Sequence, residues 1–65
     1  MIAREGINML EVIYTWEIYT NDDNNVFLGY AYANDESTAI NNSLNGNGVA
    51  SRYGLPKEKL TARKL

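Results

Sequence analysis

Two tyrosines at alternate positions are the residues of this chain best suited to making specific contacts. Tyr30 and Tyr32 lie in the segment VFLGYAYA, residues 26–33, where they alternate with glycine and alanine. Alternate residues of a β-strand point to the same face of a sheet, so both phenol rings are expected on one face. A phenol combines a large apolar area with a hydroxyl that hydrogen-bonds, and such side chains are enriched in binding interfaces. The spacing therefore predicts a contact surface.

The residue types that catalyse most reactions are missing or lack the partners they need. The chain has no Cys and no His, which excludes a thiol nucleophile, a zinc–thiolate site and the commonest general base. Asp22 and Asp23 lie in NDDNN, residues 21–25, which lacks the glycine and the distal Glu of a calcium-binding loop. NGNG, residues 45–48, lacks the rest of a phosphate-binding motif. We expect no catalytic residue, no metal site, no cofactor and no small-molecule substrate.

Nucleic-acid binding is a second hypothesis for the same tyrosines. Aromatic side chains on a sheet face stack on bases in RNA-binding domains. Residues 1–35 hold one basic and six acidic residues, whereas residues 36–65 hold five basic and two acidic ones. The basic C-terminal third would supply phosphate contacts from Arg52, Arg63 and Lys64. The net charge of −2 opposes phosphate binding, so we rank this hypothesis below protein binding.

A β-hairpin is expected to carry the tyrosines. VIYTWEIYT, residues 12–20, is rich in β-branched and aromatic residues and predicts the first strand. The polar residues 21–25 predict a turn, and residues 26–33 predict the returning strand. A five-residue polar loop does not fix the register of the hairpin.

A helix and a third strand are predicted after the hairpin. Asp35 is a suitable N-cap, and the first glycine of NGNG, Gly46, is expected to end the helix in the left-handed conformation. A helical turn is expected before Gly54, a turn at residues 56–59, and a short edge strand over residues 60–65, where Arg63 and Lys64 would discourage strand addition. The predicted fold is α+β: a single two-layer ββαβ domain over residues 1–65, with a three-stranded antiparallel sheet in the order 2-1-3. Residues 1–10 form either an arm or an extension of the first strand.

The short strand-to-helix junction predicts which face of the sheet is buried. The chain has about one residue in which to turn after Ala33, so Ala33 should lie beneath the start of the helix. Its face would continue through Ala31, Gly29 and Phe27, with bulk from Trp16, Ile18, Ile40 and Leu44. The opposite face would carry Val26 and the five predicted partner-binding residues Ile13, Tyr19, Leu28, Tyr30 and Tyr32. An apolar patch of this kind usually marks an interaction surface.

The function expected from these patterns is protein binding without catalysis. The face that carries the tyrosines would be covered by residues 1–10, by a second copy of the chain or by a foreign protein. In a fourth alternative the register is inverted and this face points inward. We expect an accessory or inhibitory protein, with nucleic-acid binding and a homodimeric structural subunit as alternatives. Its size and charge resemble those of small inhibitors encoded by phages and mobile elements, by analogy alone. The longest apolar run has eight residues and the N-terminus lacks a signal-peptide pattern, so a cytoplasmic protein without a membrane span is expected.

Overall fold

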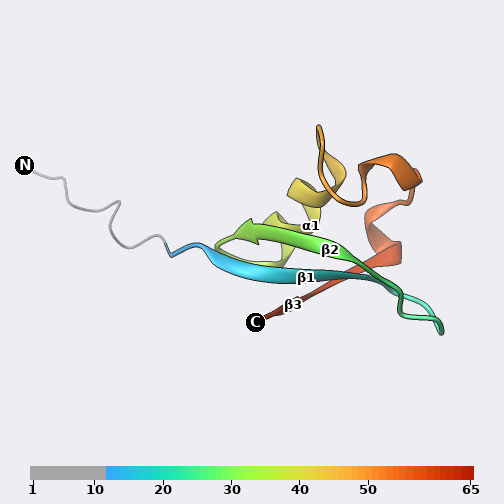
Figure 1. Ribbon diagram of the computed structural model, residues 1–65, viewed down its shortest axis with the longest axis horizontal. Helices are drawn as coiled ribbons and strands as arrows, with labels where there is room; N and C mark the ends of the chain where they lie inside the picture. Colours follow the sequence, from blue (N-terminus) through green and yellow to red (C-terminus); the bar gives the residue numbers. More distant parts are fainter. Residues whose placement is uncertain (1–11) are drawn as a thin grey trace, which may run out of the picture.

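The computed structural model describes residues 12–65, which form three antiparallel strands with helices on one side. The elements in chain order are β1 (Tyr14–Thr20), β2 (Phe27–Ala33), α1 (Glu36–Leu44), η2 (Ser51–Tyr53), η3 (Lys57–Lys59) and β3 (Leu60–Lys64). The sheet order β2-β1-β3 and the ββαβ layout are as predicted from the sequence. In Figure 1, α1 and the two short 3-10 helices lie on the same side of the sheet. The predictions for residues 1–10 lie outside the described residues.

One carboxylate organises the loop between β1 and β2. Asp22 Oδ1 accepts hydrogen bonds from the amides of Asn24 and Asn25, at 3.1 and 2.9 Å, and from the Thr20 hydroxyl at 2.8 Å. Asn25 adopts a left-handed φ of 48°, which Asn tolerates better than most residues. The Thr20 amide then donates to the Val26 carbonyl at 2.8 Å and closes the hairpin. The polar run is therefore a turn held by its own side chains.

The boundaries of α1 follow from its capping residues. Asp35 has extended backbone angles, and its carboxylate accepts a bond of 2.8 Å from the Thr38 amide, as expected of an N-cap. Asn45 ends the helix, and Gly46 follows in the left-handed region with φ 55°. The expected helical turn is η2, followed by Gly54 at φ 67°. Residues 57–59, expected as a simple turn, form the short helix η3.

Small side chains bring α1 close to the sheet. The buried apolar residues are Ile18, Ala31, Ala33, Ala39, Ala50 and Leu60. Ala31 and Ala33 lie inward as predicted, and Trp16 is half-buried, with its indole N–H donating to the Ala33 carbonyl at 2.9 Å. The remaining bulk around the core comes from half-buried Leu28, Ile40, Leu44, Val49, Leu55 and Ala62.

A β-bulge in β2 reverses the predicted directions of Phe27 and Leu28. Ile18 pairs with Gly29 and Tyr19 pairs with Phe27, so Leu28 is an extra residue without a partner on β1. Leu28 packs against the core, and Phe27 points away from it and is 46% exposed. The expectation that Phe27 lies inward and Leu28 outward was therefore wrong, because simple alternation counts no extra residue.

Candidate functional site

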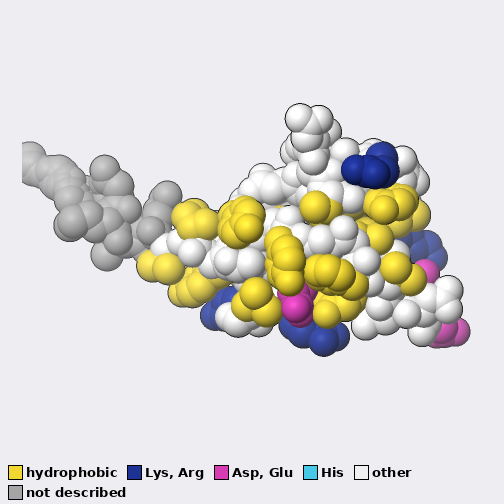
Figure 2. Space-filling view, viewed as in Figure 1, with side chains coloured by type: hydrophobic (Ala, Val, Ile, Leu, Met, Phe, Trp, Pro, Cys, Tyr) yellow, Lys and Arg dark blue, Asp and Glu magenta, His cyan; other side chains and the backbone are white. Residues whose placement is uncertain are grey.

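The side of the sheet opposite α1 is the candidate site, and we call it the outer face. The strand register places eight residues on it: Thr15, Glu17 and Tyr19 from β1, Phe27, Tyr30 and Tyr32 from β2, and Thr61 and Arg63 from β3. Within residues 12–65 no helix covers this face (Figure 1). Tyr30 is 48% exposed and Tyr32 62% exposed. In the view of Figure 2, hydrophobic side chains gather over the strands, with an acidic side chain among them and basic side chains just below.

Three aromatic rings form a contiguous row across β1 and β2. The Tyr19 and Phe27 ring centroids are 5.5 Å apart with the planes at 55°, and those of Phe27 and Tyr30 are 5.3 Å apart at 71°. These are the tilted and edge-to-face geometries that aromatic pairs prefer. We call Tyr19, Phe27 and Tyr30 the aromatic row. Its members support one another, so the surface that they present is largely formed before any partner arrives.

Two opposite charges flank Tyr19 on the outer face. Glu17 Oε1 accepts a hydrogen bond of 3.1 Å from the Tyr19 hydroxyl. The Arg63 guanidinium lies 4.9 Å from the centre of the Tyr19 ring, in a cation–π contact. Loss of water around Tyr19, and then the bond to the Glu17 carboxylate, raise the pKa of the phenol above its usual value. Tyr19 is therefore held by contacts on both sides.

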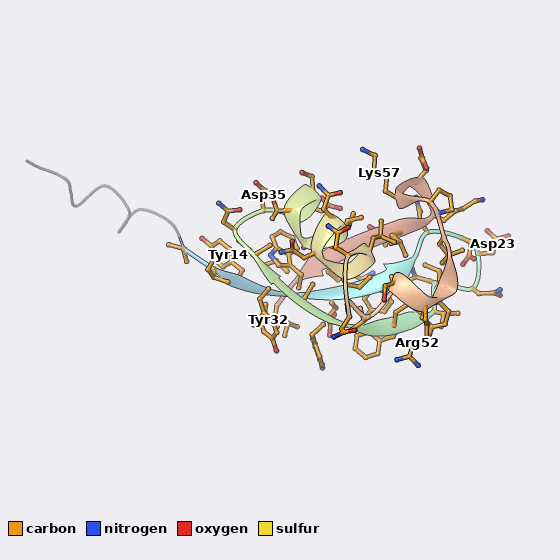
Figure 3. All side chains as sticks on the ribbon, turned by 90° about the horizontal axis from the view of Figure 1, so that it is seen from above. Tyr14, Asp23, Tyr32, Asp35, Arg52 and Lys57 are labelled. Carbon is orange, nitrogen blue, oxygen red and sulfur yellow. The ribbon has the colours of Figure 1, made fainter. Side chains whose placement is uncertain are left out.

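The three basic residues proposed for nucleic-acid contact do not gather on one face. Arg63 lies on the outer face, but Lys64, the next residue of β3, points to the other side, with its ammonium 4.3 Å from the centre of the Tyr14 ring. Arg52 belongs to η2, and Figure 3 shows it extending from that helix while Tyr32 projects from β2. Arg63 alone accompanies the tyrosines, and it shares their face with a carboxylate.

Four of the five predicted partner-binding residues remain available on the surface. Tyr30 and Tyr32 are exposed on the outer face, Tyr19 is half-buried there, and Ile13 is 61% exposed just before β1. Leu28 is the exception because the bulge turns it toward the core. The prediction missed Phe27, although a glycine inside a strand pattern, here Gly29, is a recognised sign of a bulge.

Other features of the described residues offer little chemistry. A shallow hollow of about 200 Å³ lies between α1 and η3, lined by Ser37, Ile40, Asn41 and Lys57, and it is smaller than typical ligand pockets. Residues 12–65 contain no cluster of three or more side chains suited to hold a metal ion. No helix in this part of the chain is long and apolar enough to cross a membrane.

Comparison of this chain with protein-family models, with curated proteins and with solved structures finds no match.

Proposed function

We propose that this chain is a non-catalytic docking module that binds another protein through the outer face. The observation that carries the proposal is the aromatic row beside Tyr32: Phe27, Tyr30 and Tyr32 are each about half exposed or more, on a face that no described element covers. Binding energy in interfaces concentrates in such aromatic side chains, above all when they are packed in advance and lose little freedom on binding.

The polar groups of the outer face favour a protein over a nucleic acid. Glu17 and Arg63 are neighbours in the register of β1 and β3, so the face carries one charge of each sign. A carboxylate among the rings repels phosphate, whereas a protein surface can pair with either charge. The hydroxyls of Tyr30 and Tyr32 add donors and acceptors that suit peptide groups. An accessory or inhibitory role on a larger protein agrees with this combination.

The test replaces the two most exposed rings of the outer face and keeps the fold. The double variant Tyr30→Ser with Tyr32→Ser should lose the partner that the unaltered chain captures from host lysate. Tyr53→Ser is the matched control, since Tyr53 is 51% exposed but lies on η2. Its capture should equal that of the unaltered chain, and all three proteins should give the same circular dichroism spectrum.

Two outcomes would overturn the proposal. One is capture of the same proteins by the double variant. The other is a captured species that disappears after nuclease treatment and whose binding falls steeply with salt, because that dependence reports phosphate contacts. The second outcome would favour the nucleic-acid hypothesis.

A further inference from the structure

The two edges of the sheet differ in how well they are protected against pairing. β3 has five residues, and two of them are Arg63 and Lys64. β2 has seven residues, and the stretch 24–34 contains neither a charged residue nor a proline. Charges and prolines on edge strands are the usual means of preventing strand addition. β2 lacks both.

The register shows which backbone groups of β2 face away from the sheet. The Leu65 amide donates to the Thr15 carbonyl at 3.0 Å, so the odd-numbered residues of β1 bond toward β3 and the even-numbered ones toward β2. Trp16 pairs with Ala31, which directs the amide and carbonyl groups of Tyr30 and Tyr32 outward from the edge. Within residues 12–65, only the Tyr32 carbonyl among these four groups has a partner, the Asn42 side-chain amide at 3.1 Å. A carbonyl accepts two bonds, so it keeps a free lone pair.

We propose that β2 pairs antiparallel with β2 of a second copy of this chain, around a two-fold axis at Ala31. This register places Tyr30 of each copy opposite Tyr32 of the other. Each such pair exchanges two backbone hydrogen bonds, so the dimer uses all four outward groups of each copy. It also leaves the bulge at Leu28 outside the paired segment. The two three-stranded sheets become one six-stranded sheet.

Several features of β2 favour a second copy as the occupant. Antiparallel pairing is two-fold symmetric, so an open edge is complementary to itself, and two-fold dimers are the commonest oligomers. β2 carries no charge, so pairing with a second β2 brings no like charges together. Self-pairing of β3 would instead bring the positive charges of Arg63 and Lys64 in the two copies close to each other. On the helix side, Ala31 and Ala33 are too small to clash, and on the outer face the tyrosines form cross-strand aromatic pairs.

The dimer and the proposed docking function are independent of each other. Edge pairing leaves the outer faces of both copies open on the same side of the joined sheet, so a foreign protein can still bind. A single copy can also bind a partner without dimerising. Failure of the dimer therefore does not remove the docking function, and failure of docking does not remove the dimer.

The test measures the mass of the purified chain by sedimentation equilibrium from about 1 μM to about 1 mM, because an interface of one strand pair is small and should be weak. We expect the mass to rise from that of one chain to that of two. Tyr30→Pro removes the outward amide but no hydrogen bond to β1. Its control is Tyr30→Ala, which loses the same ring and keeps the amide. The association constant of the Pro variant should be about tenfold lower than that of the Ala variant.

A second measurement uses only the unaltered chain, so it does not depend on whether Tyr30→Pro folds. Hydrogen exchange followed by NMR should show the Tyr30 and Tyr32 amides protected at the highest concentration and exposed at the lowest. A mass of one chain throughout, free exchange of both amides at high concentration, or equal association of the Pro and Ala variants would overturn it.

Discussion

At the scale of single residues, two carboxylates act as structural acceptors. The Thr38 amide is the main cause of a lowered pKa at Asp35, and the Asn25 amide is the main cause at Asp22. A carboxyl group whose pKa is lower in the folded state stabilises the fold above its unfolded pKa, near 3.9, and that stabilisation is lost as the pH falls through the folded value. Asp22 therefore stabilises the hairpin loop, and Asp35 stabilises the start of α1.

The contribution of Asp35 predicts a pH-dependent difference between two variants. Asp35→Ala removes the N-cap and should lower the melting temperature at pH 7 by about 5 °C. Asp35→Asn keeps a capping oxygen without the charge and should lower the melting temperature much less. The difference in melting temperature between the unaltered chain and Asp35→Ala should become smaller as the pH falls below about 4, because the carboxylate then takes up a proton. Thermal unfolding followed by circular dichroism checks this, and equal melting of the Ala variant at pH 7 would contradict it.

At the scale of elements, the bulge decides which apolar residue of β2 supports the core. Leu28 packs against buried residues, whereas Phe27 is 46% exposed on the outer face. Leu28→Ala should therefore reduce the free energy of unfolding by about 2 kcal/mol, near the lower limit for a large-to-alanine change in a core. Phe27→Ala should cost less than about 1 kcal/mol. Urea unfolding measures both, and the reverse order would mean that strict alternation, not the bulge, describes β2.

The bulge also marks where prediction from the sequence ends. Local signals were enough for the hairpin, for the cap at Asp35 and for the inward direction of Ala33. Gly29, which follows the bulge, lies against a distant segment: a Cβ at Gly29, whose φ is +146°, would lie 2.6 Å from Cγ1 of Val49. Gly29 is a local sign of a bulge, but strict alternation takes no account of it, so Phe27 was missed. The opposite directions of Arg63 and Lys64, in contrast, follow from alternation within one strand.

At the scale of the whole molecule, the core is small for the sheet that it supports. Six apolar residues are buried within residues 12–65, and only Ile18 and Leu60 among them are larger than alanine. Domains of this length typically have a free energy of unfolding of about 3–10 kcal/mol, and small chains without disulfides or metals often gain further stability from association. An exposed aromatic face and an open strand edge are surfaces on which such association can bury additional area.

The small core predicts that one residue decides whether the chain folds. Ile18 is fully buried, and Ile18→Ala should cost about 2–5 kcal/mol, which is comparable with the whole free energy of unfolding. We expect this variant to be largely unfolded at 37 °C by circular dichroism. Ile18→Val removes one methylene, should cost about 1 kcal/mol and should stay folded. If Ile18→Ala melts cooperatively at nearly the same temperature as the unaltered chain, the stability of the protein does not come mainly from the core beneath α1. Cooperative folding of that variant only at high concentration would place the missing stability in a contact between copies.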